Sequence, residues 1–190
     1  SDIQRNQNIV DNSTNPPGIL GLVLNAAKAR IQGVEIEATV KPIAALTLTG
    51  LYSYLDARYR EYSFAGVDLE GVRLPFTPKH KASVTARFDL PVPDGLGQPY
   101  IFASYAYNSS FRWNDLDLPG NTVVGYGLID MSAGWDDIGG SRLSATAFVT
   151  NLSNKLYRQI SSVQYASVGI SSAIYSEPRM YGLRLRYAFD

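Results

Sequence analysis

The sequence predicts an all-β fold in which antiparallel strands form part of a transmembrane β-barrel. Three observations predict it. Apolar and polar side chains alternate at every second residue in seven segments, one side of each segment is free of charge, and the connections between segments are alternately short and long. Successive side chains of a strand point to opposite faces, and a barrel strand shows only every second one to lipid. The chain has no continuous apolar run of about 18 residues, the length expected of a membrane-spanning helix.

The seven alternating segments lie at residues 34–41, 46–54, 82–90, 101–107, 128–135, 143–149 and 181–189. The residues on their apolar sides are, in chain order, Val34, Ile36, Ala38, Val40; Leu46, Leu48, Gly50, Tyr52, Tyr54; Ala82, Val84, Ala86, Phe88, Leu90; Ile101, Ala103, Tyr105, Tyr107; Ile129, Met131, Ala133, Trp135; Leu143, Ala145, Ala147, Val149; and Tyr181, Leu183, Leu185, Tyr187, Phe189. A weaker strand is expected near residues 2–10, and eight strands are enough to close a small barrel. Because Ile31 and Val34 cannot share a face, we also expect a β-bulge near Gly33.

Charged residues occur only on the opposite sides of these segments. They are Glu35, Glu37, Lys41, Arg87, Asp89, Asp130, Arg184 and Arg186. A charge at the lipid midplane of a barrel costs about 2–4 kcal/mol, whereas a charge that faces the lumen can stay hydrated. A soluble β-sandwich also alternates apolar and polar residues, so the alternation by itself leaves both folds open.

The connections favour the barrel. Short links are expected at residues 41–45, 91–99 and 136–140, and long polar stretches at 11–28, 57–78, 108–122 and 152–177. Outer-membrane barrels have short turns at one end and long loops at the other, whereas a compact soluble domain rarely has several long structureless loops. Aromatic residues are expected at both ends: Trp135, Tyr187 and Phe189 near the short turns, and Tyr105, Tyr107 and Phe111 toward the long loops. Such rings favour the membrane–water boundary.

Composition excludes several classes of function. Lys+Arg and Asp+Glu both number 17, so no net charge favours nucleic acid, and the absence of cysteine excludes disulfide scaffolds and thiolate sites. His80 is the only histidine, and one histidine does not make a typical zinc or iron site, so we expect it to have a structural or interfacial role. No phosphate-binding loop, dinucleotide fingerprint or serine-nucleophile elbow occurs. We therefore expect no catalytic residues, no metal site, no cofactor and no enzyme activity.

Four stretches, taken in order, resemble the C-terminal half of the barrel of TonB-dependent receptors. They are NAAKARIQGVEIEATVKPIAALTLTGLYSYLDARY, LPFTPKHKASV, FVTNLSNKLYR and EPRMYGLRLRYAFD. The resemblance implies a 22-stranded barrel with an N-terminal plug, of which this chain holds about the last eight strands. Residues 1–190 are then the C-terminal portion of the barrel domain, and the plug and the TonB-contacting segment are absent from this chain.

Both ends of the sequence bear on this expectation. The chain begins SDIQRNQ without an initiator methionine or an export signal, which favours an internal fragment. The terminal aromatic that is usual in the family is followed here by Asp190, so the assembly signal is not in its usual form.

Two loop stretches supply candidate ligand contacts. Arg58, Tyr59, Arg60 and Tyr62 form a charged and aromatic run that can meet an anionic ligand through forked hydrogen bonds or stacking. In a second loop, Trp113 precedes two carboxylates. These two are Asp115 and Asp117, whose spacing matches no calcium loop, so a solvated loop is favoured over a cation site.

The resemblance implies a receptor in the cell outer membrane that imports a scarce nutrient, by family default a ferric siderophore. Its expected partners are outer-membrane lipid, the plug and remaining barrel strands of the parent protein, TonB through the absent N-terminal region, and a small-molecule or metal-chelate ligand. Two alternatives stay open at this point. One is an independent eight-stranded structural or adhesive barrel, which needs residues 2–10 to pair with the last strand. The other is a soluble all-β binding module, in which the apolar faces of two sheets meet.

Overall fold

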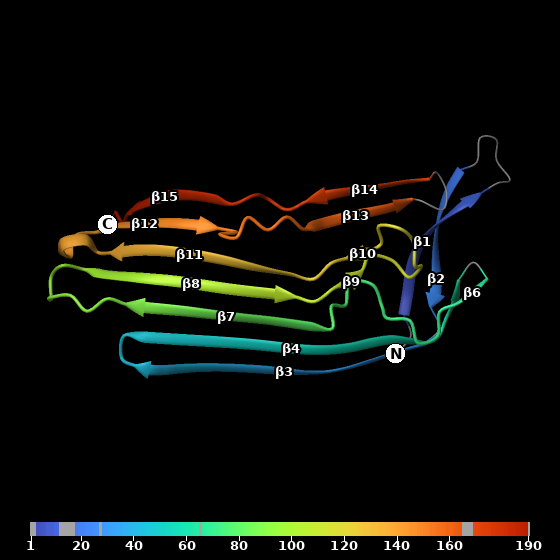
Figure 1. Ribbon diagram of the computed structural model, residues 1–190, viewed down its shortest axis with the longest axis horizontal. Coiled ribbons are helices and arrows are strands. Elements are labelled where there is room, and N and C mark those ends of the chain that lie inside the picture. Colours follow the sequence, from blue (N-terminus) through green and yellow to red (C-terminus); the bar gives the residue numbers. More distant parts are fainter. Residues whose placement is uncertain (1–2, 12–17, 27, 65, 165–168, 190) are drawn as a thin grey trace.

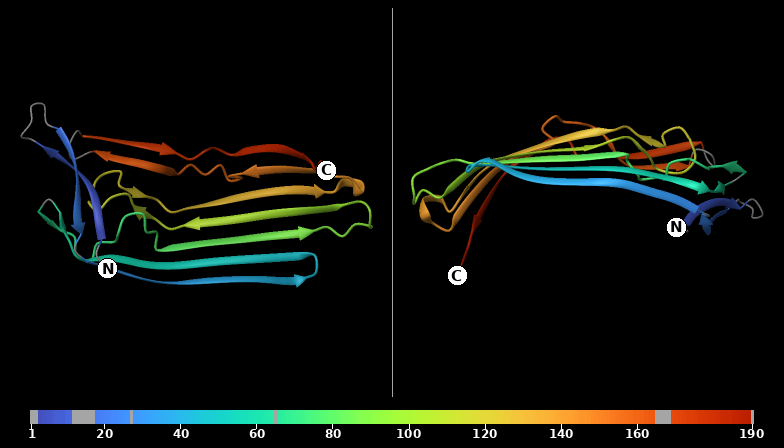
Figure 2. Two further views of the ribbon diagram at one scale, coloured as in Figure 1. Left: turned by 180° about the vertical axis from the view of Figure 1, so that it is seen from behind. Right: turned by 90° about the horizontal axis from the view of Figure 1, so that it is seen from below.

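A computed structural model describes residues 3–11, 18–26, 28–64, 66–164 and 169–189, with side-chain surroundings given from residue 28 onward except at 160–164 and 171. Its main element is one antiparallel sheet of seven strands in which each strand pairs with its neighbour in the chain. From one edge to the other these are β3 (Lys28–Ile43), β4 (Leu46–Glu61), β7 (His80–Asp89), β8 (Gln98–Asn108), β11 (Tyr126–Asp136), β12 (Leu143–Thr150) and β15 (Met180–Tyr187). Figure 1 shows them side by side, and Figure 2 shows that the sheet is a single curved layer. The seven expected strands are thus confirmed.

The two ends of the sheet differ as expected. Short connections join the strands at one end, at residues 44–45, 90–97 and 137–142, the last containing the 3-10 turn η1 (Ile138–Gly140). The other end carries the first loop (62–79), the second loop (109–125) and the third loop (151–179) (Figure 1). These loops contain short hairpins of their own: β5 (Ser63–Phe64) with β6 (Val67–Asp68), β9 (Phe111–Arg112) with β10 (Thr122–Val123), and β13 (Arg158–Gln164) with β14 (Ile170–Tyr175).

The register places every expected apolar residue of the paired strands on one face. Val34 pairs with Tyr54, Val84 with Tyr105, and Ala147 with Leu183, and the alternation is unbroken between these points within each strand. Directly paired residues project to the same side of a sheet. We call this side the apolar face and the other side the polar face. The apolar face stays open in the structure, with exposed fractions of 58% for Ile36 and 68% for Leu183.

An open apolar face rules out the soluble sandwich for the described residues, because no second sheet covers it. A patch of this size needs a hydrophobic partner, since soluble monomers rarely expose contiguous apolar areas above a few hundred Å². No helix in the described part of the chain is long and apolar enough to cross a bilayer.

One expectation about the loops was wrong, and one of the two alternatives lacks the strand pairing that it requires. The chain before Lys28 forms a hairpin in which β1 (Ile3–Asp11) pairs with β2 (Gly18–Ala26), so the stretch 11–28 contains a strand and is not a loop throughout. Because β1 pairs with β2 and β15 pairs with β12, the closure between residues 2–10 and the last strand that an eight-stranded barrel requires is not formed in the described structure.

The expected bulge at Gly33 was also wrong. Gly33 pairs with Leu55 in regular register, and the shifts in this ladder lie instead between Lys28 and Ala29 and between Val40 and Ile43. A side chain at Gly33 would collide with the backbone carbonyl of Tyr54. The glycine therefore permits a close approach of two regular strands, and Ile31 simply projects from the opposite face to Val34.

Rings mark both ends of the apolar face. Trp135 lies at the short-turn end, where its indole N–H donates to the carbonyl of Leu96 at 2.8 Å. Tyr187, the last residue of β15, and Phe189 lie at the same end and pack edge to face, with ring centroids 5.0 Å apart. At the long-loop end the Tyr52 hydroxyl and His80 Nδ1 lie 2.8 Å apart. The expected positions of Trp135, Tyr187 and Phe189 at the short-turn end are confirmed, and Tyr107 and Phe111 lie toward the long loops, whereas Tyr105 pairs with Val84 near the middle of the sheet. His80 joins the rings at the loop end.

Candidate functional site

The polar face carries the charged residues of the sheet and holds them with local partners. Arg87 Nε donates to Asp89 Oδ1 at 2.8 Å, and its guanidinium lies 3.9 Å from the centroid of the Tyr100 ring. The Arg184 guanidinium lies 5.7 Å from the Phe148 ring. Arg87 and Asp89 thus form an ion pair on this side of the sheet.

Two of these rings lie over glycines of the neighbouring strand. A Cβ at Gly134 would collide with the ring of Tyr100, its cross-strand partner, and a Cβ at Gly182 would lie 2.8 Å from the Phe148 ring. The missing side chains let both rings lie flat along the polar face. The rings in turn give Arg87 and Arg184 an aromatic surface to stack on.

Above the sheet, the first loop folds over the polar face and forms a small core. Tyr59 and Tyr62 are buried with ring centroids 4.6 Å apart, and Leu69 packs on them. The partly buried residues around this core are Phe64, Val72, Leu74 and Leu116. The loop backbone is held against β4 by hydrogen bonds from Leu74 N to the Ala57 carbonyl and from Tyr59 N to the Val72 carbonyl. This core gives the first loop a defined shape.

The second loop is organised around one buried asparagine. Asn121 is fully buried, and its side-chain oxygen accepts from the backbone N–H groups of Trp113 at 3.0 Å and Asn114 at 2.8 Å. Its amide nitrogen donates to the carbonyls of Asn114 and Leu116. The buried side-chain amide of Asn121 thus uses both its acceptor and its donor atoms, and it pairs backbone groups of the loop that would otherwise lack partners.

Three contacts join the loops into one body, which we call the loop cap. The Tyr59 hydroxyl donates to Asp115 Oδ1 at 2.7 Å, which links the base of the first loop to the second. Arg158 donates to the Gly120 carbonyl at 2.8 Å, which links the third loop to the second. Tyr126 and Tyr157 stack with centroids 3.9 Å apart and planes 15° from parallel.

The third loop is anchored where it leaves and re-enters the sheet. The Asn151 side chain accepts from Lys155 N at 2.7 Å and donates to the carbonyls of Lys155 and Glu177. Its backbone N–H donates to Asp130 Oδ1 at 2.8 Å on the polar face. Ser176, also buried, receives the N–H of Tyr157. Together these bonds fix the two ends of the loop to the sheet.

The structure distributes the seven expected ligand residues over different environments. Tyr59, Tyr62 and Asp115 are buried inside the loop cap. Arg60 is exposed, Trp113 is half-buried, and Asp117 is exposed and pairs with Arg112 at 3.3 Å. Arg58 is exposed and donates to Asp56 and to the Gly71 carbonyl, both at 2.9 Å.

Arg58 and Tyr59 diverge because they are consecutive strand residues. The ladder between β3 and β4 is regular from Tyr59 down to Leu48, so Arg58 projects from the same side as Tyr54, and Tyr59 from the opposite side. A sequence run of arginines and tyrosines therefore does not form one surface. Tyr59 and Tyr62 are buried in the loop cap, and Arg58 projects from the opposite side of the strand.

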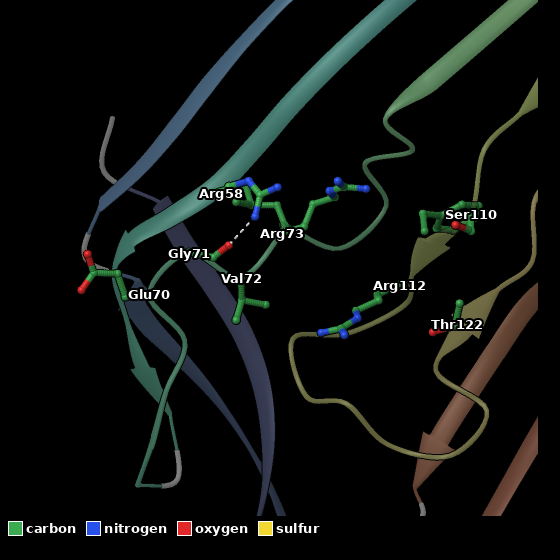
Figure 3. Close-up of a pocket in the computed structure, with 10 residues that line it drawn as sticks. Arg58, Glu70, Gly71, Val72, Arg73, Ser110, Arg112 and Thr122 are labelled. Atoms are coloured by element: carbon green, nitrogen blue, oxygen red, sulfur yellow. Dashed lines mark hydrogen bonds between the residues drawn. The ribbon is translucent and has the colours of Figure 1, made fainter.

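A cavity of about 640 Å³ lies beside Arg58 (Figure 3). It lies between the return strand of the first loop and the β9–β10 hairpin, and it is lined by Arg58, Glu70, Gly71, Val72, Arg73, Leu74, Ser110, Phe111, Arg112 and Thr122. Three of these residues are arginines and one is a carboxylate. Sequence reasoning missed Arg73 and Arg112, which come together only through the folding of two loops.

No group of three or more His, Asp or Glu side chains gathers as a metal site among the described residues. His80 is instead held between rings, 5.5 Å from the Tyr54 ring and 6.2 Å from the Tyr52 ring by centroids. Its place at the loop end of the apolar face supports the interfacial role expected from the sequence.

Comparison with known proteins gives a consistent family. Residues 3–152 match the family model described as TonB dependent receptor-like, beta-barrel. No curated protein matches the chain. Among solved structures, the ferric yersiniabactin uptake receptor of Yersinia pestis has a TM-score of 0.73 at 20% identity, covering 89% of this chain and 25% of that one.

Two further structures are similar in the same way. The ferric preacinetobactin receptor of Acinetobacter baumannii has a TM-score of 0.68 at 22% identity, covering 98% of this chain and 26% of that one. The ferric-catecholate import receptor of Escherichia coli K12 has a TM-score of 0.64 at 21% identity, covering 87% of this chain and 22% of that one. The chain thus spans about a quarter of the length of each of these structures.

Proposed function

Because the chain belongs to the TonB-dependent receptor-like β-barrel family and to the outer membrane, we propose that it is the C-terminal part of a receptor that imports a ferric siderophore. The apolar face then contacts lipid, the polar face lines the lumen, and the loop cap lies on the extracellular side. The plug and the remaining strands belong to the parent protein, and TonB supplies the energy through the plug.

The observation that carries this proposal is the loop cap. Three long loops are held together by hydrogen bonds and ring stacking at the end of a lipid-facing wall. A preformed surface binds a bulky ligand at a lower entropic cost than loops that must first be ordered. This favours capture of a large, rare solute over passive diffusion through an open pore.

The chemistry of the loop cap suggests which residues meet the chelate. Besides Arg58, the members of the expected ligand set that the loop cap does not bury are Arg60, Trp113 and Asp117. An arginine and a tryptophan suit an anionic, partly aromatic chelate through forked hydrogen bonds and stacking. Tyr59, Tyr62 and Asp115 then act as positioning residues that keep the loop backbone in place.

The test is iron uptake by iron-starved cells that express the complete receptor chain as their only outer-membrane iron receptor. A panel of ⁵⁵Fe-loaded catecholate, hydroxamate and mixed-ligand siderophores is supplied to cells with and without TonB. We expect saturable uptake of one class that depends on TonB, and about tenfold weaker binding in an Arg60→Gln, Trp113→Ala double variant. A Lys41→Gln variant at the short-turn end serves as the control.

Three outcomes would refute the import proposal. One is uptake that is unchanged without TonB, and another is uptake that is equal in cells lacking the receptor. The third is failure of every siderophore class in cells that display correctly folded receptor at wild-type abundance. Unchanged binding in the double variant would remove Arg60 and Trp113 from the ligand site while leaving the transport assignment in place.

A further inference from the structure

Arg58, which lines this cavity, projects from the lipid side of the wall and not into the lumen. Arg58 pairs directly with Arg30 on β3 and with Arg73 on the return strand of the first loop. Paired residues project to the same side, and regular alternation from Tyr54 places that side above the apolar face. We call Arg30, Arg58 and Arg73 the basic row.

The basic row puts like charges directly opposite one another across three neighbouring strands. Such cross-strand pairs are destabilising unless something neutralises them. One carboxylate nearby, Asp56, accepts from Arg58 at 2.9 Å. Arg112 faces the same cavity from the second loop, where it pairs with Asp117 at 3.3 Å, and Glu70 also contributes to the lining (Figure 3). Four arginines therefore face three carboxylates, so positive charge remains in excess around this cavity.

Arg73 is the member of the basic row that has an unsatisfied hydrogen-bond donor. Its Nε is buried and has no hydrogen-bond partner in the described structure. A buried charged donor without an acceptor costs more than an ordinary unmade hydrogen bond, so the site is energetically incomplete as it stands. An oxyanion in the cavity would supply the missing acceptor, and the guanidinium fork matches a phosphate particularly well.

The position of the basic row relative to the bilayer indicates where a phosphate would come from. Tyr52, Tyr54 and His80 mark the outer boundary of the apolar face, and the Lys79 ammonium lies 5.4 Å from the Tyr54 ring centroid. Arg58 lies four residues beyond Tyr54 on the same strand, about 13 Å along it and about 10 Å above it for a typical barrel tilt. Polar headgroups occupy that layer, just outside the hydrocarbon core.

We propose that the basic row, with Arg112 across the cavity, binds the phosphate of a phosphorylated lipid headgroup in the outer leaflet. The lipid chains lie along the apolar face, and the rings at its upper boundary support the headgroup. A nutrient in the lumen is on the other side of the wall from the basic row, so the lipid site is separate from the ligand surface of the loop cap. The inference depends on membrane placement and not on the identity of the imported solute.

The test uses the complete receptor chain in detergent, stripped of lipid, with binding followed by native mass spectrometry. The probes are bis-phosphorylated lipid A, chemically dephosphorylated lipid A and inorganic phosphate. We expect an Arg58→Gln, Arg73→Gln double variant to bind bis-phosphorylated lipid A at least tenfold more weakly than wild type. Dephosphorylated lipid A should bind wild type weakly, and the double substitution should not weaken it further.

The matched control is Lys41→Gln with Arg142→Gln, which removes the same charge at the short-turn end of the wall. It should bind lipid A like wild type. An Arg73→Lys variant retains the charge but not the fork, and it should fall between wild type and the double variant. Heat-modifiable migration on gels shows that each variant is folded.

The inference is overturned if the folded double variant binds bis-phosphorylated lipid A as well as wild type does. It is also overturned if removal of the phosphates leaves wild-type binding unchanged. Inorganic phosphate that binds as tightly as the lipid would assign the cavity to a free anion instead. Loss of siderophore uptake in the double variant with intact lipid binding would place these arginines in the nutrient site, so failure here and failure of the import proposal are distinguishable.

Discussion

The two faces of the sheet are built from the same strands, yet they obey different rules. On the apolar face the residues of all seven strands are free of charge from the short turns to Tyr54, and arginines begin only above the rings. On the polar face charged residues occur at every height, and arginines stack on Tyr100 and Phe148. The comparison shows that the place of a residue in the strand alternation, even or odd, decides whether its side chain faces lipid or the lumen.

The largest effect should come from placing a charge at the middle of the lipid side. Val84→Arg puts a guanidinium on the apolar face, between Gly50 and Tyr105, and should cost about 2–4 kcal/mol of unfolding free energy. Thr85→Arg, one residue on, lies on the polar face beside Thr49 and Ser104 and should cost under about 1 kcal/mol. Urea unfolding of the complete receptor in liposomes measures both, and equal losses would break the comparison.

A second substitution tests the loop end of the polar face. Tyr59→Phe removes the hydroxyl that donates to buried Asp115 and should lower the stability of the loop cap by about 1–3 kcal/mol. Limited proteolysis of the extracellular loops should then become faster. In a double-mutant cycle with Asp115→Asn, additive losses would mean that the two side chains do not act as a pair.

Glycines sharpen the comparison at smaller scale. Gly134→Ala on the polar face forces the Tyr100 ring to move and weakens its contact with Arg87, at a cost of about 1 kcal/mol. Gly50→Ala on the apolar face meets nothing within 4 Å and should be neutral or slightly stabilising. The difference in urea midpoint between these two alanine variants is the measurement, and a larger loss at Gly50 would contradict the assigned faces.

The smallest effect is expected for the ion pair on the polar face. Arg87 and Asp89 are 39% and 49% exposed, so Asp89→Asn should change stability by at most about 1 kcal/mol and less at high salt. Unfolding curves at low and high ionic strength provide the readout. A large loss that salt does not reduce would show that this face is drier than a hydrated lumen.

Most of the sheet was predictable because contact with lipid requires an uncharged side chain at every second residue of each strand. Each apolar side expected from the sequence is on one face of the structure, and the short and long connections alternate as expected. The strand expected near residues 2–10 is β1, but its partner β2 and the β13–β14 hairpin were missed. Loop strands do not face lipid on one side, so they carry no comparable alternation, and β2 is apolar at nearly every position.

The candidate site was less predictable, for a geometric reason. Tyr59 and Tyr62 of the run from Arg58 to Tyr62 do pack together. Nothing in the sequence of the run, however, indicates that a later loop buries Tyr59 and leaves Arg58 exposed. Arg30 could have been found, because it has the same parity in its strand as Val34. Arg73 could not, because its place opposite Arg58 depends on the path of the first loop.

The outermost strands of the sheet, β3 and β15, have a consequence for what must lie next to them in a bilayer. In the described part of the chain, each pairs on one side only. In hydrocarbon every unpaired amide and carbonyl costs several kcal/mol. Wherever these two margins meet lipid, each therefore needs a further strand alongside it.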